Sequence, residues 1–205
     1  MRLTLLLLLS LTTAASAKDK KGHSAKGSIL INGEQVRVRW TDGDSFKFLS
    51  GPYDGKGTRL SGYNTLEAYG PVHRWGKWTP KELFALAESS SEVAGSREWD
   101  CTTDGKLDGY GRVLVSCPDL SEEMIRQGQA LAYAVEGTAN EKLLAAQADA
   151  MKAGRGMWAK GTVKGVVTSV HSADEGEEGA PYNRVVDTRT GAAQKRTHEQ
   201  TYLTC

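Results

Sequence analysis

Short segments with period-two alternation near the start of the chain most constrain what it can fold into. Apolar and polar side chains alternate over residues 36–40 and again over 45–49, with the turn signal Asp42-Gly43 between them. Such alternation is typical of β-strands with one buried face. A third short strand is expected over residues 58–63, after a turn-rich connection. The pattern therefore predicts a three-strand meander in the N-terminal part of the chain.

Three later segments have the apolar spacing and the end signals of α-helices. The first has a capping box, in which Thr79 caps the helix, Pro80 takes the first helical position and Glu82 reaches back to the cap. The other two helices are expected at about residues 119–128 and 140–154, and each ends at a glycine.

Two further strands are expected in a hairpin that carries two of the three cysteines. Cys101 and Cys117 lie 16 positions apart, and the turn signal Asp108-Gly109 lies at their midpoint. A hairpin that turns there places the two cysteines opposite each other, and a disulfide closing a loop of this length contributes about 3 kcal/mol in the chain-entropy description. Two separate buried thiols are the alternative. Cys205 is then the odd cysteine, either free or paired between molecules.

Strands in runs of three and two, with helices between and after them, predict an α+β fold that is mainly β. The expected architecture is a five-stranded barrel of the oligonucleotide-binding (OB) type with about three α-helices. This domain is expected over residues 28–160. Residues 161–205 differ in character, with an acidic patch, a short apolar run and a basic tail. They form a C-terminal extension of unknown role, either packed on the domain or partly disordered.

The first residues predict export. A basic start, an apolar run over residues 3–11 and a small-residue cleavage site at 15–17 are typical of a signal peptide over residues 1–17. The apolar run is shorter than the ~20 residues that span a bilayer, which disfavours a membrane anchor. The polar, Lys-rich residues 18–27 are expected to form a flexible leader. The mature protein is expected to be secreted or periplasmic, monomeric and free of the membrane.

The formal net charge of the chain is only +1, which excludes attraction of the whole molecule to a polyanion as the main source of binding. Phosphate binding must therefore come from a local group of cations. Arg59 is expected on the concave face of the barrel, where it needs an anionic partner or ligand. Arg112 projects from the tip of the second hairpin, where a planar guanidinium can hold phosphate oxygens. The alternatives are a structural ion pair of Arg59 with Glu67 and a solvated turn at Arg112.

Two carboxylates lie on the turn between the first two predicted strands. Asp42 and Asp44 can both offer oxygen ligands to a hard cation there. Aspartate and glycine are also common in ordinary hairpin turns, so this cluster alone does not establish a metal site.

These clusters, in this order and spacing, resemble the staphylococcal nuclease (thermonuclease) family. The shared features are Asp-Gly-Asp-Ser at residues 42–45, an arginine eight residues before a glutamate, Tyr-Gly-Arg at residues 110–112 and a tryptophan that closes the domain. The resemblance extends from about Val36 to Trp158. It implies an OB-type barrel, calcium dependence, and hydrolysis of DNA and RNA phosphodiester bonds in endo- or exonuclease mode.

The resemblance assigns roles to three sets of residues by their positions. The catalytic trio is Arg59, Glu67 and Arg112; the metal ligands are Asp44, Asn64 and the backbone carbonyl of Thr65; the nucleotide contacts are Tyr110 and Tyr133.

Asn64 departs from the family pattern, which has an aspartate there, and Leu66 stands where the family usually has proline. Calcium affinity depends on the charge of its ligands, so Asn64 predicts weaker metal binding or a changed metal preference. Two functions follow. One is a metal-dependent nuclease, and the alternative is a nucleic-acid-binding module that has lost its metal affinity.

Overall fold

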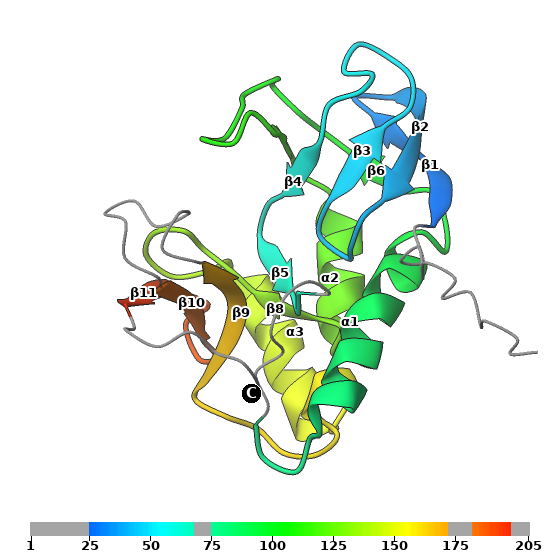
Figure 1. The fold of residues 1–205 in the computed structure, drawn as a ribbon. Helices are drawn as coiled ribbons and strands as arrows, with labels where there is room; N and C mark the ends of the chain where they lie inside the picture. The colour runs from blue at the N-terminus through cyan, green and yellow to red at the C-terminus, as the bar shows by residue number, and fades with distance from the viewer. Residues whose placement is uncertain (1–24, 68–74, 172–181, 198–205) are drawn as a thin grey trace, which may run out of the picture.

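The computed structural model of the chain describes residues 25–67, 75–171 and 182–197 (Figure 1). The predicted signal peptide over residues 1–17 and the odd cysteine, Cys205, lie outside these residues. None of the helices in the described ranges combines the length and the apolar character that a membrane span requires.

The first sheet has four strands and follows the predicted alternation. Strands β1, β2 and β3 pair in antiparallel succession, and Val38 and Trp40 on β2 point into the core. Asn32 and Gly33 connect β1 to β2 with positive φ angles of 52° and 86°, as a two-residue type I′ hairpin requires. Strand β1 begins at Lys26, within the segment expected to be a flexible leader. The strands, in the order β3-β2-β1-β6, are Phe46–Phe48, Glu34–Trp40, Lys26–Ile31 and Asp100–Cys101.

Strand β4 (Thr58–Leu60) pairs in parallel with β7 (Val113–Val115). Its pairing with β3 is limited to the isolated antiparallel bridge from Lys47 to Gly57, beside β4, so the predicted three-strand meander is present only in part. The parallel pair places Arg59 directly opposite Leu114.

The predicted strand over residues 58–63 is interrupted at Gly62, which has a φ of 89°. After this break, β5 (Tyr63–Thr65) pairs with β8 (Ala130–Ala132). Tyr63 turns into the core, where it is fully buried and its hydroxyl donates to the backbone carbonyl of Gly43 at 2.7 Å. The break thus gives Tyr63 a position in the core rather than a place beside Arg59 on one face of a single strand.

Strand pairing in the described residues does not form one continuous barrel. It gives a four-stranded sheet, two two-stranded sheets and a three-stranded C-terminal sheet. Isolated bridges from Lys47 to Gly57 and from Thr102 to Ser116 connect the four-stranded sheet to the β4–β7 pair at both of its edges. Each strand of the four-stranded sheet and of the β4–β7 pair therefore has a neighbour on both sides, although several of these contacts are single bridges. The α+β class with three α-helices is confirmed.

The first and third helices begin where the cap signals predict. In the capping box, the backbone N–H of Thr79 donates to Oε2 of Glu82 at 3.0 Å, and the backbone N–H of Glu82 donates to Oγ1 of Thr79 at 3.4 Å. Asn140 caps the third helix with its side-chain oxygen. The second helix begins at Pro118, slightly earlier than predicted, because proline suits the first helical position. The helices are α1 (Pro80–Ala94), α2 (Pro118–Arg126) and α3 (Glu141–Lys152), followed by the 3-10 turn η1 (Gly156–Trp158).

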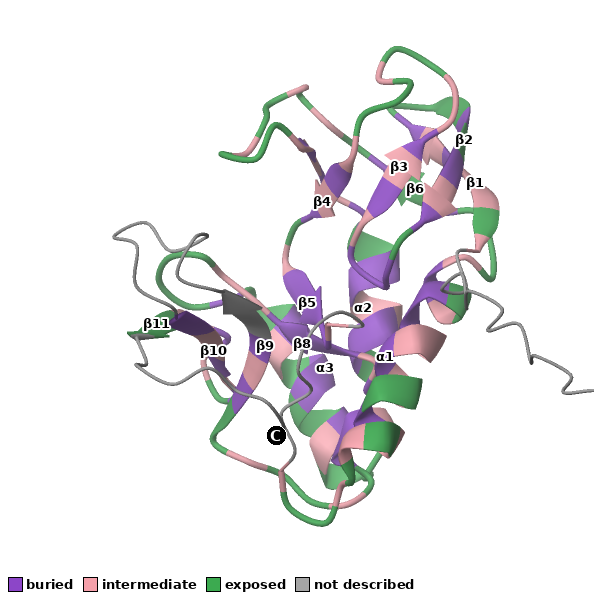
Figure 2. Cartoon of the chain, in the orientation of Figure 1, coloured by how far each residue is buried: buried purple, intermediate pink, exposed green. Residues whose placement is uncertain are grey.

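Two groups of buried side chains hold these elements together (Figure 2). The first contains residues of the four-stranded sheet, β7 and α2, including Trp40 and Phe46, whose rings meet edge to face with centroids 5.0 Å apart. The second contains residues of α1, β8 and η1, including Leu83, Leu131 and Trp158. Val166 and Val186 of the C-terminal extension belong to this second group, so the described part of the extension is packed on the domain.

The extension forms an antiparallel sheet beside β5 and β8 (Figure 1). The backbone N–H of Ala134 donates to the carbonyl of Gly191 at 2.8 Å, and that of Ala193 donates to the carbonyl of Ala134 at 3.1 Å. A Cβ added to Gly191 would lie 2.4 Å from the side chain of Ala139, so the close approach depends on glycine. The strands, in the order β11-β10-β9, are Ala193–Thr197, Tyr182–Asp187 and Gly165–His171.

The predicted disulfide between Cys101 and Cys117 is confirmed, with a Cα–Cα distance of 4.3 Å. Two separate thiols, the alternative, are therefore excluded. The chain between the cysteines turns back at its tip, where the backbone N–H of Asp108 donates to the carbonyl of Arg112 at 2.9 Å. The disulfide thus closes the base of the hairpin whose tip carries Arg112.

Candidate active site

The turn between β2 and β3 buries two carboxyl groups next to each other. Oδ1 of Asp42 accepts hydrogen bonds from the backbone N–H of Asp44 at 3.0 Å and from the hydroxyl of Ser45 at 2.6 Å. Burial, and then the charge of Asp44, raises the pKa of Asp42 well above its ordinary value. Gly43 is required between them, because a Cβ there would lie 2.7 Å from the side chain of Thr65.

Arg59 on β4 reaches from its strand to two side-chain oxygens. Its Nη1 donates to Oδ1 of Asp44 and its Nη2 donates to Oδ1 of Asn64, both at 2.7 Å. Asp44 also accepts from the backbone N–H of Thr65 at 2.9 Å through Oδ2. Asn64 in turn donates from Nδ2 to Oγ1 of Thr168 on β9, at 2.9 Å. Because Asp44, Asn64 and Thr168 are almost fully buried, the network fixes the orientation of the Arg59 guanidinium.

Glu67 follows β5 and is only partly exposed. Burial, and then repulsion from Asp44, raises its pKa to about 7, while Arg59 and Arg112 act in the opposite direction. The ion pair of Arg59 considered from the sequence is therefore made with Asp44 rather than with Glu67. The carboxyl group of Glu67 nevertheless lies within electrostatic range of both arginines.

Arg112 is held in position by Asp108 within the same hairpin. Its Nε and Nη2 both donate to Oδ2 of Asp108 at 2.7 Å, and its backbone N–H donates to Oδ1 at 2.9 Å. Tyr110, at the tip, is 69% exposed, and its ring centroid lies 5.3 Å from the Arg112 guanidinium carbon. Arg112 is therefore paired with a carboxylate, while its side chain remains 36% exposed to solvent.

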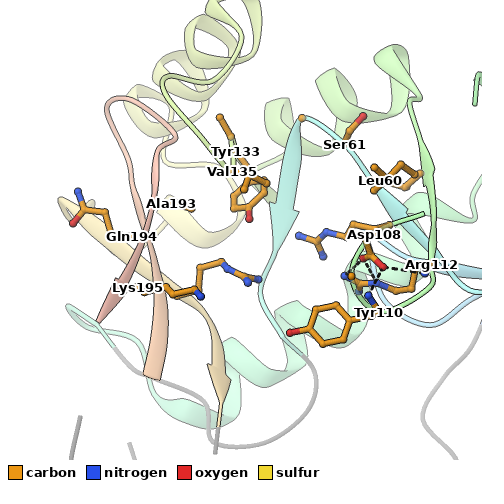
Figure 3. A pocket seen from close by; sticks show the side chains of 16 residues that line it. Leu60, Ser61, Asp108, Tyr110, Arg112, Tyr133, Val135, Ala193, Gln194 and Lys195 are labelled. Atoms are coloured by element: carbon orange, nitrogen blue, oxygen red, sulfur yellow. Dashed lines mark hydrogen bonds and ion pairs between the residues drawn. The ribbon is translucent and has the colours of Figure 1, made fainter. Parts of the chain in front are cut away.

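A pocket of about 490 Å³ brings Arg59 and the hairpin of Arg112 together (Figure 3). Asp44, Asn64 and Glu67 are not among the residues that line it. Figure 3 shows Tyr110 and Arg112 on one side of it, Gln194 and Lys195 on the opposite side, and Tyr133 between them. Arg59 also lines the pocket, and its guanidinium carbon lies 5.7 Å from the ring centroid of Tyr133. The pocket thus brings together the two arginines and the two tyrosines to which the sequence assigns substrate contacts.

The predicted metal ligands provide hard oxygen atoms but little charge. The side-chain oxygens of Asp44 and Asn64 accept hydrogen bonds from Nη1 and Nη2 of Arg59, at 2.7 Å each, and oxygen atoms of this kind are the ligands that a hard cation takes. Across residues 25–67, 75–171 and 182–197, no group of three or more His, Cys, Asp and Glu side chains stands in an arrangement that could hold a metal ion. Asn64 contributes an oxygen without a charge.

Three residues that the sequence did not single out take part in this site. Thr168 orients Asn64, and Arg184 on β10 and Lys195 on β11 line the pocket. All three lie in the C-terminal extension, whose pairing with Ala134, just after β8, has no signature in local sequence patterns. The short apolar run that follows Arg184 is compatible with a strand, but it does not say which surface the strand faces.

Comparison with known proteins identifies a family for the part of the chain that carries Arg59, Glu67 and Arg112. A search of curated proteins found no match. Residues 58–160, just over half of the 205-residue chain, match the family described as staphylococcal nuclease homologue. The match includes Arg59, Glu67 and Arg112 and ends before the C-terminal sheet. The chain therefore belongs to the staphylococcal nuclease homologue family.

Proposed function

We propose that this protein is a nuclease that hydrolyses phosphodiester bonds of DNA, RNA or both with the help of a divalent metal ion. One observation carries the proposal: Arg59 on β4 and Arg112, in the turn before β7, line one pocket, and the carboxyl group of Glu67 lies within electrostatic range of both. Family membership supports the same class of activity.

The two guanidiniums supply what phosphodiester cleavage demands. Negative charge grows on the phosphate oxygens as water attacks, and fixed cations in a partly buried pocket stabilise that charge. Arg59 and Arg112 are each held by an aspartate, Asp44 and Asp108, and these partners hold the guanidiniums in orientation before substrate arrives. On binding, some of the N–H groups of each guanidinium turn to phosphate oxygens, which accept two parallel hydrogen bonds from the planar fork.

Glu67 is the carboxylate available to the attacking water. It accepts a hydrogen bond from the water or removes its proton.

Asp44, Asn64 and the backbone carbonyl of Thr65 are the residues that would hold a divalent cation, and calcium is the ion typical of the family. The cation would add positive charge beside the scissile phosphate. With one carboxylate in this set where the family has two, we expect a metal affinity below that typical of the family, or a preference for another divalent ion.

Tyr110 and Tyr133 flank the pocket and offer ring faces on which a base can stack. Stacking tolerates every base and both sugars, so both DNA and RNA fit this surface. The signal-peptide pattern of residues 1–17 supports export, to the periplasm or outside the cell, and the disulfide is consistent with an oxidising compartment.

Digestion by the purified mature protein tests the proposal. Single-stranded DNA, duplex DNA and RNA are incubated with calcium, magnesium or manganese, and with a chelator. We expect cutting with at least one metal and none with the chelator. Glu67→Gln should abolish cutting, and Glu92→Gln, an exposed carboxylate on α1, serves as the matched control. A folded wild-type sample that cuts no substrate with any of the metals contradicts the proposal.

A second candidate is a nucleic-acid-binding module without catalysis. It is favoured by one observation, the engagement of Asn64 by Arg59 and Thr168 in place of a charged metal ligand. Binding of an oligonucleotide with no cutting under any metal supports this candidate, and metal-dependent cutting rejects it.

A further inference from the structure

The C-terminal sheet lies outside the family match, yet it is bound directly to the candidate active site. Thr168 on β9 accepts a hydrogen bond from Asn64 at 2.9 Å. At the other edge, the backbones of Gly191 and of Ala193, at the start of β11, form hydrogen bonds with Ala134, which itself lines the pocket. The buried side chain of Val186 fixes β10 between them. The C-terminal sheet is therefore attached to the domain at both edges and forms one side of the pocket.

Arg184 presents a third guanidinium from this wall. It lies on β10, is partly buried and lines the same pocket as Arg59 and Arg112. The register of β9 on β10 shifts between Arg184 and Val185, and such irregularities re-aim a side chain relative to a regular strand. Arg184 also lies close enough to act electrostatically on Glu67.

Lys195 stands directly opposite Arg184 in the antiparallel pair β10–β11, and it also lines the pocket. Like charges at directly opposed positions destabilise a sheet. An anion between them removes this cost, because a phosphate accepts hydrogen bonds from both cations. Lys195 in addition lies 5.1 Å from the ring centroid of Tyr182, which supports its position.

The arginines of the pocket differ in their partners. Arg59 is paired with Asp44 and Arg112 with Asp108. Within the described ranges, the guanidinium of Arg184 has no hydrogen-bond or ion-pair partner. It can therefore bind an anion without giving up an existing carboxylate.

We propose that Arg184, together with Lys195, binds a backbone phosphate of the nucleic-acid strand, so that the C-terminal sheet forms a third side of the substrate groove. This assignment rests on the proposed function in its substrate class, but it does not require cutting. It gives the extension a direct role in substrate binding. A surface pair of solvated cations with no ligand is the alternative.

The test measures binding without catalysis. A fluorescein-labelled single-stranded oligonucleotide of about ten nucleotides, within the range that one OB-type domain covers, is titrated with the mature protein in chelator, and anisotropy gives Kd at several salt concentrations. The variants are Arg184→Gln, Arg184→Lys and the matched control Arg189→Gln, which removes an exposed arginine from the turn between β10 and β11. Thermal unfolding of each variant confirms that it is folded.

We expect Arg184→Gln to raise Kd about tenfold, the effect of losing one charge-assisted contact. The slope of log Kd against log salt should also fall by about 0.7, the value for one single-strand phosphate contact. Arg184→Lys should keep most of the slope, and Arg189→Gln should change Kd by less than about twofold, as a solvated charge does.

Equal effects of Arg184→Gln and Arg189→Gln would overturn the assignment, and so would the absence of wild-type binding in chelator at low salt. The assignment and the proposed function fail separately. If the wild type binds the oligonucleotide, the Arg184→Gln variant binds it more weakly and neither cuts with any metal, then phosphate binding by Arg184 is supported and the nuclease proposal is rejected. If the wild type cuts nucleic acid but the substitution of Arg184 leaves Kd unchanged, then the nuclease proposal is supported and phosphate binding by Arg184 is rejected.

Discussion

Arg59 donates a hydrogen bond from Nη2 to Oδ1 of Asn64 at 2.7 Å, while its Nη1 binds Asp44 at the same distance. The amide at position 64 is therefore part of the network that orients a candidate catalytic guanidinium. It is held from the other side by Thr168. The departure of Asn64 from the family pattern is thus accompanied by a contact from the C-terminal extension.

Asn64→Asp should strengthen metal-dependent cutting. The change adds a second carboxylate to the proposed ligand set, and the Thr168 hydroxyl can reverse its role and donate to the new oxygen. We expect the calcium concentration for half-maximal cutting to fall by about tenfold, because affinity follows ligand charge. The measurement is a calcium titration of DNA cutting by both proteins. An unchanged calcium requirement would show that position 64 does not face the metal.

Arg59→Lys should separate orientation from charge. A lysine keeps the positive charge beside Asp44 but cannot bridge two oxygens as the guanidinium fork does. We expect kcat to fall by about a hundredfold, the effect of removing one preorganised donor. Steady-state cutting kinetics provide the measurement, and wild-type kcat in the lysine variant would exclude Arg59 from the reaction.

Arg59→Met should instead destabilise the fold. It leaves Asp44, whose side chain is only 3% exposed, without its counter-charge. Breaking a buried pair in this way costs about 3 kcal/mol. Denaturant unfolding at pH 7 checks the value. A loss below about 1 kcal/mol, the range of surface pairs, would mean that solvent reaches Asp44.

Thr168→Val should reveal how firmly the extension is joined to the site. Valine matches threonine in shape but offers no acceptor, so Nδ2 of the buried Asn64 loses its partner. An unsatisfied buried donor costs about 1–3 kcal/mol. Thr168→Ser keeps the hydroxyl and serves as the control in the same unfolding measurement. Equal stabilities of the valine and serine variants would contradict the role of this hydrogen bond.

The sequence predicted correctly those features that depend on residues close together in the chain. The capping box is formed by the backbone and side chains of Thr79 and Glu82, which lie within four residues of each other, and the structure contains it. The disulfide between Cys101 and Cys117 follows from a turn midway between them. Arg59 and Arg112 follow from short motifs, and both line the pocket.

Features that depend on pairing between distant segments were not predictable in this way. The break at Gly62 sends Tyr63 into the core and changes the partner of the next strand, and no local pattern specifies that partner. The C-terminal sheet pairs with a segment about sixty residues earlier in the chain, through contacts such as Ala134 to Gly191. Arg184 therefore enters the site only once the tertiary arrangement is known.

Removal of the disulfide should loosen the hairpin that carries Arg112. The bond closes a loop with a sequence separation of 16, and its loss is expected to cost about 3 kcal/mol in the chain-entropy description. Reductant should lower the unfolding midpoint of the wild type and leave Cys101→Ala/Cys117→Ala unchanged. A wild-type midpoint that does not respond to reductant, with free thiols detected, would show that the bond contributes nothing to stability.

Glu82 should give the stability of the protein a specific dependence on acid pH. It accepts from Nζ of Lys160 at 2.6 Å and from the backbone N–H of Thr79 at 3.0 Å, and these hydrogen bonds lower its pKa from 4.5 to about 2. A pKa that folding lowers contributes stability above the unfolded value and loses it as the pH falls toward the folded value. The wild type should therefore be more stable than Glu82→Gln at pH 7, and the difference should shrink between about pH 4.5 and pH 2. Denaturant midpoints across this range, with Glu92→Gln on the same helix as control, measure the effect. A difference that stays constant down to pH 3 would mean that the interactions of Glu82 with Thr79 and Lys160 do not depend on its charge.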